Sequence, residues 1–277
     1  MVDLLGMLTD RQWFLCATLL YGLGMMYSVF LWRKGFRKDD RIHYFLLLAG
    51  FALNTTAMFM RGFSFNRCPV NNLFEATMFV DWSAVGVYLI LGLWQKFRFV
   101  GAFASPIFLF LGIFALMPGL DHQDPEGQIT KYWAVSLHAV LILFSYGAFG
   151  LCAVASGMYL IQERHLKTHN ILAILSKLPS IERLESIASR LVLAGVILLS
   201  VGLSFAPFLG QPDRPLAWYQ DAKVIWSIVI WATYVGVVSS RYLWRFGGRP
   251  MAWALIACFV FLILTFSGTN LMSEMHQ

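Results

Sequence analysis

Charged residues are scarce in this chain of 277 residues. Asp, Glu, Lys and Arg together make up 13% of it, whereas hydrophobic residues make up 58% and the mean hydropathy is +0.66. A soluble globular domain carries about one quarter charged residues, and a disordered chain carries few apolar ones. The composition therefore excludes both classes and indicates an integral membrane protein.

Cysteine is also rare, and its placement excludes two kinds of chemistry. Three of the four cysteines, Cys16, Cys152 and Cys258, lie within apolar runs, and only Cys68 lies in a loop. This spacing gives neither a disulfide framework nor a CxxC redox motif. The first apolar run has no basic segment before it, so we expect it to be the first membrane span rather than a cleavable signal.

Long apolar stretches are abundant. A helix needs about 20 apolar residues to cross a bilayer, and eight windows meet this need. They cover residues 12–32, 43–62, 75–94, 99–118, 133–161, 191–209, 224–244 and 251–272. The sequence predicts an all-α polytopic membrane protein with about eight transmembrane helices. Residues 1–277 are expected to form a single integral membrane domain, because no room is left for a separate soluble one.

The distribution of Lys and Arg predicts the orientation. Fifteen of these 21 residues lie in loops near residues 33–41, 96–98, 164–190 and 241–249, and the other six lie on the opposite side. Loops rich in Lys and Arg face the cytoplasm. Both termini are therefore expected outside, in a multi-pass protein of the bacterial inner membrane. The net charge of +6 reflects this topology, so membrane lipid is an expected partner and nucleic acid is not.

Residues 162–190, between the fifth and sixth windows, predict a cytoplasmic hairpin of two short amphipathic helices on the membrane surface. Pro179 separates the two helices and Ser180 can cap the second. Apolar side chains repeat at helical spacing, at Ile171, Leu172, Leu175 and Leu178 and again at Ile181, Leu184, Ile187 and Ala188.

Two features stand out inside the windows. Ala153 and Gly157, four residues apart, predict close contact with a neighbouring helix. Asp81 lies within the third window, where an ionisable group is costly and indicates a functional site. The alternative for Asp81 is a carboxylate that is hydrogen-bonded to a neighbouring helix.

Two histidines and an aromatic stretch are expected together on the outer face. His138 lies little more than one turn into the fifth window, and His276 follows the eighth. The stretch 218–226, which contains Trp218, Asp221 and Trp226, lies between them on the same side. Two imidazoles beside a flat apolar surface favour bis-histidine haem ligation. The alternatives are aromatic interface anchors and histidines hydrogen-bonded at helix ends.

Several cations lie near this constellation in the expected topology. Haem propionates are anions, and charge-assisted pairs with Lys or Arg would hold them. The candidate cations are Arg61, Lys131, Arg214 and Lys223.

Three stretches of the chain resemble a known family. The chain looks like a CcsA-type cytochrome c assembly protein, a haem-handling membrane family that includes ResC and HemX-like members, and the resemblance covers most of the chain. The stretches are Arg61-Gly62 followed by Pro69-Val70-Asn71-Asn72-Leu73-Phe74-Glu75, Leu137-His138 followed by Ser145-Tyr146-Gly147-Ala148, and Gly268-Thr269-Asn270-Leu271 followed by His276.

The resemblance implies that His138 and His276 are the axial ligands of the iron of haem b. It implies that the chain presents haem to apocytochrome c for cytochrome c maturation. Reduced iron and reduced client cysteines are needed for that attachment, and the chain has no CxxC motif to supply electrons. A second assembly subunit that holds the apocytochrome is therefore an expected partner.

The tryptophan motif departs from the family pattern. It keeps Trp218, Asp221, Lys223 and Trp226 but lacks the second Trp, the Pro and the Glu. Two functions stay open for this reason: a component of a haem lyase, or a HemX-like non-catalytic regulator or scaffold of haem synthesis. A solute transporter is disfavoured, because the sequence shows no inverted repeat or pair of broken helices.

His43 needs a separate interpretation. It begins the second window on the cytoplasmic side, about 30 Å of hydrocarbon away from the level of His138. The two therefore cannot share an iron. His43 is either an interfacial residue or the mark of an inner haem site of the kind that the family resemblance implies.

Overall fold

The described part of the protein is helical. A computed structural model describes residues 9–33, 41–65, 72–121, 133–168, 180–205, 222–244 and 247–274, and no strand occurs among them. The contacts divide these residues into two compact units. Unit 1 contains the described residues up to Asp121, and unit 2 contains those from Trp133 onward.

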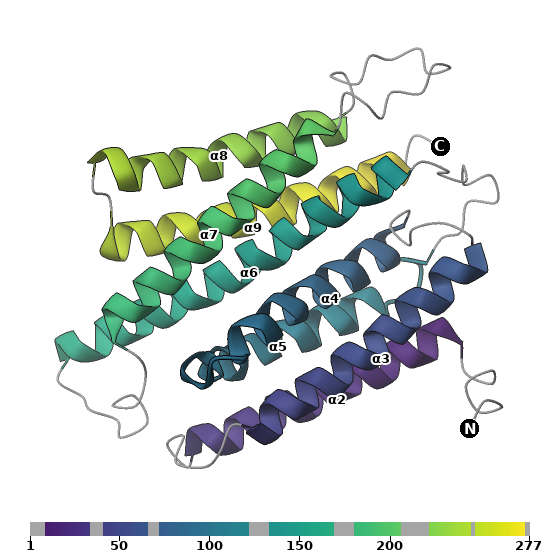
Figure 1. Cartoon of the computed structure of the whole chain (residues 1–277), viewed down its shortest axis with the longest axis horizontal. Helices are drawn as coiled ribbons and strands as arrows, with labels where there is room; N and C mark the ends of the chain where they lie inside the picture. The colour runs from purple at the N-terminus through teal and green to yellow at the C-terminus, as the bar shows by residue number, and fades with distance from the viewer. Residues whose placement is uncertain are drawn as a thin grey trace. The chain divides into compact units, whose positions relative to one another are not determined.

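Unit 1 consists of four α-helices and one short 3-10 helix (Figure 1). Helix α2 packs on α3 and α5, and α4 also packs on α3 and α5, so the four helices close a ring of contacts. The elements are α2 (Asp10–Arg33), α3 (Arg41–Phe65), α4 (Leu73–Gly92), η1 (Gln95–Phe97) and α5 (Phe99–Ala115). A cluster of Phe14, Ala57, Phe74, Met78 and Ala115 lies in the core.

Unit 2 repeats this arrangement. Helix α6 packs on α7 and α9, and α8 packs on the same two helices. Successive helices run in opposite directions, so α6 and α8 begin at the end of the unit where α7 and α9 end (Figure 1). The elements are α6 (Trp133–Thr168), α7 (Ile181–Ser204), α8 (Ala222–Trp244) and α9 (Gly248–Glu274).

Every expected span coincides with a helix, which confirms the all-α prediction for the described residues. Six helices have a segment long and apolar enough to cross a membrane: α2, α3, α4, α6, α7 and α9. Helix α5 is apolar but shorter, and α8 is not among the six. The chain is thus a multi-pass membrane protein by its helices, while eight spans and external termini stay predictions.

The largest difference from the sequence prediction is the start of α7. Residues 181–190, expected as part of a surface hairpin, are the first turns of one continuous helix that reaches Ser204. The buried side chains explain this continuity, because one stripe runs through both parts: Leu184, Ile187, Ala188, Leu191, Val192, Gly195, Leu199 and Gly202. At the other end, α6 continues to Thr168, and residues 169–179 of the expected hairpin lie outside the described residues.

Glycine allows α6 and α7 to approach closely, although not at the position that the sequence suggested. A Cβ atom at Gly157 would meet no described atom within 4 Å, whereas one at Gly195 would lie 2.4 Å from Cε1 of Phe149. The Phe149 ring cannot yield easily, because it is stacked on Tyr234 with 3.7 Å between the ring centroids. Gly195 is therefore the residue that sets this contact.

We predict that Gly195→Ala lowers the free energy of unfolding by about 1–3 kcal/mol, the usual cost of overpacking a core. Gly157→Ala is the matched control, since it makes the same change in a helix of the same unit without a clash, and it should leave stability equal or slightly higher. Thermal unfolding of the purified protein in detergent measures both. Equal melting temperatures for the two variants would contradict the proposed contact.

Candidate functional site

The structure describes three of the predicted site residues in full. His138 lies in the second turn of α6, Trp226 in the second turn of α8, and Arg61 in the last turns of α3. The backbone of Lys223 lies in the first turn of α8, but its side chain is outside the described residues. His276, Trp218 and Asp221 also lie outside them.

His138 is held by a backbone carbonyl of the neighbouring helix. Its Nδ1 lies 2.7 Å from the carbonyl oxygen of Gly202, near the end of α7. A carbonyl oxygen only accepts hydrogen bonds, so Nδ1 is the donor and carries the hydrogen. In a neutral ring the lone pair is then on Nε2. This is the arrangement that metal-ligating histidines adopt, with the second ring nitrogen fixed by a carbonyl or carboxylate.

The sequence produces this bond through the end of α7. The last carbonyls of a helix have no intrahelical partner, and among the described residues the carbonyl of Gly202 accepts the amide of Phe205 and Nδ1 of His138. A Cβ atom at position 202 would lie 2.9 Å from Cγ1 of Ile142. The absence of a side chain therefore lets the carbonyl approach α6 closely enough to meet the imidazole.

Trp226 lies at the same end of unit 2 as His138, because α6 and α8 both begin there (Figure 1). Its side chain is 41% exposed, and its ring contacts the edge of Phe261 on α9 with 6.2 Å between the centroids. A second aromatic pair links α6 and α9, since Tyr146 meets Phe266 edge-on at 5.8 Å. This end of unit 2 thus carries one oriented imidazole and an exposed indole.

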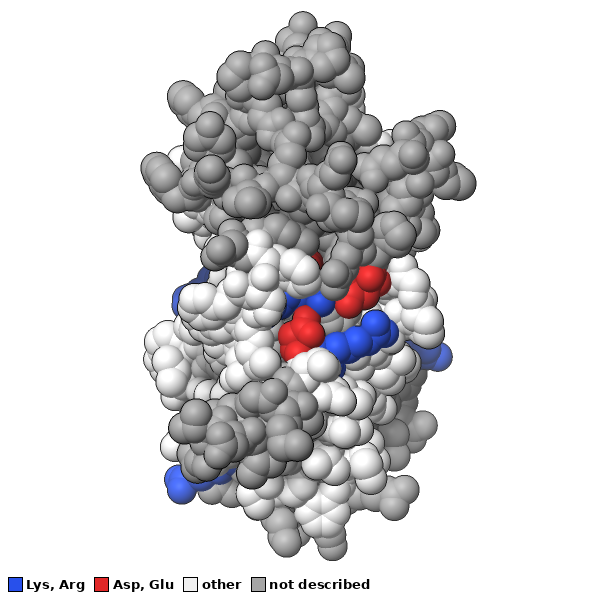
Figure 2. All heavy atoms as spheres, turned by 90° about the vertical axis from the view of Figure 1, so that its right-hand side faces the viewer, with Lys and Arg blue, Asp and Glu red and all other residues white. Residues whose placement is uncertain are grey.

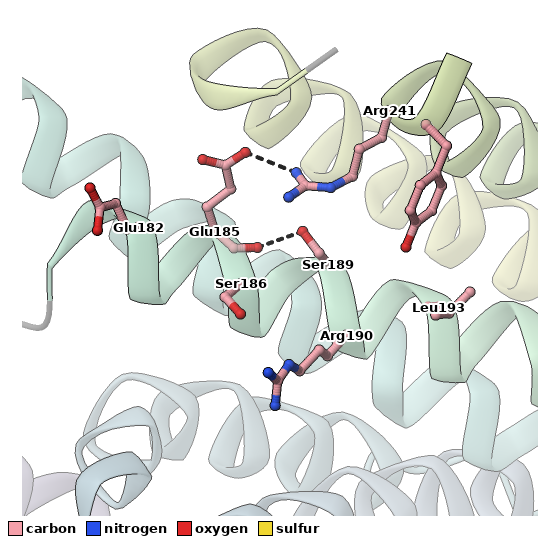
Figure 3. Close-up of a pocket in the computed structure, with 8 residues that line it drawn as sticks. Glu182, Glu185, Ser186, Ser189, Arg190, Leu193 and Arg241 are labelled. Atoms are coloured by element: carbon pink, nitrogen blue, oxygen red, sulfur yellow. Dashed lines mark hydrogen bonds and ion pairs between the residues drawn. The ribbon is translucent and has the colours of Figure 1, made fainter. Parts of the chain in front are cut away.

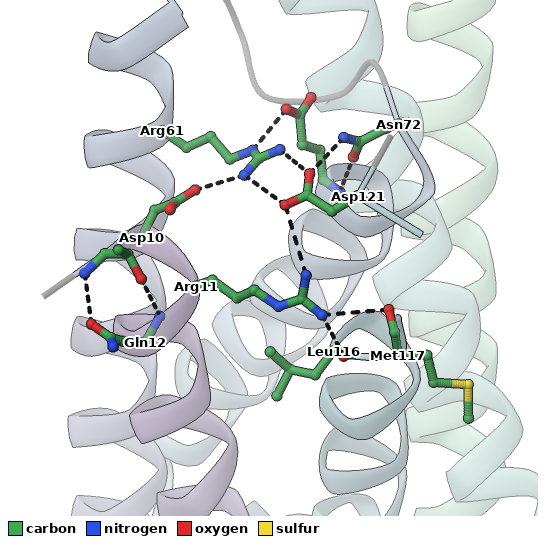
Figure 4. Close-up of polar contacts among 10 residues, drawn as sticks. Asp10, Arg11, Gln12, Arg61, Asn72, Leu116, Met117 and Asp121 are labelled. Carbon is green, nitrogen blue, oxygen red and sulfur yellow. Dashed lines mark hydrogen bonds and ion pairs between the residues drawn. The ribbon is translucent and has the colours of Figure 1, made fainter. Parts of the chain in front are cut away.

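Arg61 lies in unit 1, where three carboxylates surround it (Figure 4). Its Nε donates to Glu75 at 2.8 Å, its Nη1 to Asp10 at 2.7 Å, and its Nη2 to Asp121. The Arg61 side chain is 2% exposed and that of Glu75 is fully buried. A haem propionate would have to displace one of these carboxylates to reach the guanidinium. The structure thus gives Arg61 partners that the sequence prediction did not include.

The ion cluster also fixes the start of α4. Asn72 caps this helix, because its side-chain oxygen accepts the amide of Glu75 at 2.8 Å. The Asn72 amide group donates to Asp121 at 3.0 Å, and the amide of Phe74 donates to the carbonyl of Leu120 at 3.2 Å. The segment that follows α5 is therefore attached to the beginning of α4 by both side chain and backbone.

Arg11 adds a second cation to the cluster. Its Nη2 donates to the carbonyl of Leu116 at 2.6 Å, and its Nη1 lies 4.0 Å from Asp121. Charged side chains of both signs gather near the centre of the face in Figure 2, where most of the other described surface is uncharged. The described part of the cluster thus combines two arginines with three carboxylates, at one end of unit 1.

Two buried polar residues of unit 1 bear on interpretations that the sequence left open. His43 is 1% exposed, and its Nε2 has no hydrogen-bond partner among the described residues. Asp81 is fully buried, and neither carboxylate oxygen has a described partner. The alternative in which Asp81 bonds to a neighbouring helix is therefore not met in the described structure.

A groove lies on unit 2 between the first turns of α7 and the last turns of α8 (Figure 3). Its volume is about 340 Å³. Glu185 accepts a hydrogen bond from Nη1 of Arg241 at 2.8 Å, which joins the two walls. The lining residues are Glu182, Glu185, Ser186, Ser189, Arg190, Leu193, Arg241 and Tyr242. The groove is therefore polar and of mixed charge, with apolar side chains at one end.

Sequence reasoning found His138, Trp226 and Arg61 but missed what they touch. The Gly202 carbonyl is backbone and leaves no pattern in the sequence, and Asp10 and Asp121 lie 51 and 60 residues from Arg61. The only local signal was Asn72 three residues before Glu75, which is the spacing of a helix cap.

Comparison with known proteins gives relatives that match most of the chain. Protein HemX of Brevibacillus brevis is 26% identical over 263 residues, which are 94% of this chain and 96% of that protein. The cytochrome c biogenesis protein CcsA of Prochlorococcus marinus (strain NATL2A) is 23% identical, over 90% of this chain and 88% of that protein. Protein NrfI of Wolinella succinogenes is 27% identical over 79% of this chain, but the match covers 24% of NrfI.

The sequence model of a protein family matches most of the chain as well. It covers residues 70–276, from the loop before α4 to beyond the end of α9. The match therefore includes His138, the tryptophan stretch and two of the carboxylates around Arg61. On this match, the chain belongs to the family described as Cytochrome C assembly protein.

Proposed function

We propose that the protein binds haem at the end of unit 2 where α6 begins and presents it to apocytochrome c. The observation that carries this proposal is the hydrogen bond from Nδ1 of His138 to the carbonyl of Gly202, which leaves Nε2 as a nitrogen ligand. His276 is the proposed second axial ligand of haem b. It follows Glu274, the last residue of α9, by two positions.

The aromatic stretch before and within α8 completes the proposed site. Trp218 and Trp226 would lie against the flat macrocycle, while Asp221 and Lys223 would orient its edge. Trp226 suits this role because its indole is 41% exposed on a helix that begins at the same end as α6. Bound haem would supply the iron and vinyl groups, and the protein's own residues would hold, orient and shield them.

The proposal includes partners outside this chain. Attachment of haem to a cytochrome needs electrons for the iron and the client cysteines, and the sequence has no CxxC motif. A second assembly subunit would therefore hold the apocytochrome, and the chain itself would be one component of a haem lyase. The site would face the outer side of the bacterial inner membrane, as the Lys and Arg distribution predicts.

A second candidate function is a HemX-like regulator or scaffold of haem synthesis. Two observations favour it: the near full-length match to a protein named HemX, and the groove between α7 and α8. In the predicted orientation that groove faces the cytoplasm. A partner of haem synthesis would then bind there, and the aromatic stretch would serve only as a membrane anchor.

If His138 and His276 ligate one haem, the reduced purified protein should show the visible spectrum of low-spin bis-histidine haem. His138→Ala or His276→Ala should weaken it, and added imidazole should partly restore it. His169→Ala, in the segment between α6 and α7, is the control and should leave the spectrum unchanged. An unchanged spectrum in the double variant would refute the assignment.

The role of Arg61 can be separated from haem binding by measuring the haem-free protein. Arg61→Met removes the cation that is bonded to three carboxylates, and breaking a buried ion pair in this way costs about 3–5 kcal/mol. We expect a lower melting temperature without haem. Lys167→Met removes an exposed pair with Glu163 and should change stability by less than about 0.5 kcal/mol.

The opposite result for Arg61 has a clear meaning. An Arg61→Met protein that is as stable as the wild type without haem, yet retains less haem, would assign this residue to the propionates.

Trp226→Ala distinguishes haem presentation from the second candidate function, regulation of haem synthesis. Loss of one aromatic contact, worth about 0.5–1.5 kcal/mol, should lower haem retention about two- to tenfold and reduce the yield of holo-cytochrome c. Trp244→Ala is the matched control, because this residue ends the same helix and is 77% exposed. Both variants should be compared at equal expression.

If the protein instead regulates haem synthesis, variants of the groove should have a larger effect than Trp226→Ala. Glu182→Ala and Arg190→Ala change exposed residues of the groove without opening the core, whereas Leu184 is fully buried and is not a suitable target. Altered haem synthesis in these groove variants, with normal cytochrome c in Trp226→Ala, would favour the HemX-like function.

A further inference from the structure

The interior of unit 1 contains buried polar side chains at one height along the bundle, near the middle of α3 and α4. Three contacts fix the register of this antiparallel pair: Arg61 with Glu75, Nε1 of Trp82 with Thr55 at 2.8 Å, and the hydroxyl of Tyr44 with the carbonyl of Leu89 at 3.1 Å. In the sequence, Asn54 directly precedes Thr55 and Asp81 directly precedes Trp82. They therefore lie at one level, about 9 Å along α4 from Glu75.

The polar groups at this level are buried and unpartnered. Asn54 and Asp81 are both 0% exposed. The side-chain nitrogen and oxygen of Asn54 and both carboxyl oxygens of Asp81 have no hydrogen-bond partner among the described residues. The hydroxyl of Tyr21, from α2, is also buried without a described hydrogen-bond partner, and the Tyr21 ring packs against Gly50, one turn before Asn54 on α3. Three helices thus bring an amide, a phenol and a carboxyl group together inside an apolar bundle.

Among the described residues, no cation is bonded to either carboxylate oxygen of Asp81. Helix α5, which also packs on α4, has no ionisable residue in its sequence. On α3 the nearest cation is Arg61, which is about 10 Å along the helix from Asn54 and is bonded to three carboxylates. In the direction away from Arg61, the ionisable groups are His43 and Tyr44 on α3 and Tyr88 on α4. They lie about 10–16 Å along these helices from Asn54 or Asp81.

An isolated charge at such a position is too costly to persist, so the carboxyl group is held in its neutral form. The neighbours suit an exchange between the two forms. Asn54 offers an acceptor oxygen to the neutral acid, and it offers N–H donors to the carboxylate. The Tyr21 hydroxyl is a second donor. A carboxyl group that only filled space would not need donors and acceptors from two further helices.

We propose that Asp81, with Asn54 and Tyr21, forms an internal proton-binding site of unit 1. The step is a transfer of one proton between the Asp81 carboxyl group and water, which leaves a carboxylate and a hydronium ion and requires no other reactant. This site lies in unit 1 and does not depend on the proposed haem ligation by His138 in unit 2. It gives the membrane interior a group that can store and return a proton.

Infrared difference spectroscopy of the full-length protein tests this site. The carbonyl stretch of a protonated carboxylic acid is distinct from that of a carboxylate, and it shifts to lower frequency when D2O replaces water. We expect the wild type to show such a band at neutral pH and the band to shift in D2O. Asp81→Asn should abolish it, whereas Glu185→Gln, which changes an ion-paired carboxylate of unit 2, should not.

A second variant covers the case in which Asp81→Asn fails to fold. Tyr21→Phe keeps the ring that packs against Gly50 and removes only the hydroxyl, so the band should remain and change frequency.

Four results would overturn the proposal: no protonated band in the wild type, a band unchanged by Asp81→Asn, a band unmoved by D2O, or a band insensitive to Tyr21→Phe. Loss of the wild-type band on adding sodium chloride would also overturn it, because the site would then bind sodium.

Discussion

Polar groups that leave water must find partners inside the protein, and in a chain with 13% charged residues this requirement shapes every site. Arg61 meets it with three carboxylates, and His138 meets it with a backbone carbonyl. Some buried hydroxyls meet it within their own helix, as Thr18 does by donating to the carbonyl of Phe14 at 3.0 Å. Against this background Asp81 stands out among the unpartnered buried groups of unit 1, because it is the one carboxyl group among them in the described residues.

The sequence predicted the helices well, because in an apolar solvent a long apolar run has few alternatives to a helix. It placed the start of α7 poorly. Ile181, Leu184 and Ile187 have the spacing of a surface helix, and the same spacing also describes a stripe buried against α6. Periodicity identifies the apolar face of a helix but not what covers it. The difference between a hairpin and a longer helix is decided by packing that the pattern does not contain.

The candidate site was predictable by residue type but not by contact. His138 was identifiable because an imidazole near the end of an apolar window is unusual, yet the atom that orients it is the carbonyl of a glycine 64 residues away. The partners of Arg61 show the same limit. The family match begins at residue 70, so it includes Glu75 and Asp121 but excludes Arg61 and Asp10. Three of the five charged residues of this cluster, Asp10, Arg11 and Arg61, therefore come from helices that precede the matched region.

The acceptor in the hydrogen bond between His138 and Gly202 is a backbone oxygen, so a substitution at Gly202 can affect this bond only indirectly. No substitution at position 202 can delete the accepting oxygen, since every amino acid has that carbonyl. What a substitution can do is add a side chain against Ile142 and move α7 away from α6. The orientation of the imidazole therefore depends on the distance between α6 and α7. Substitutions at neighbouring positions preserve this orientation as long as they preserve that distance.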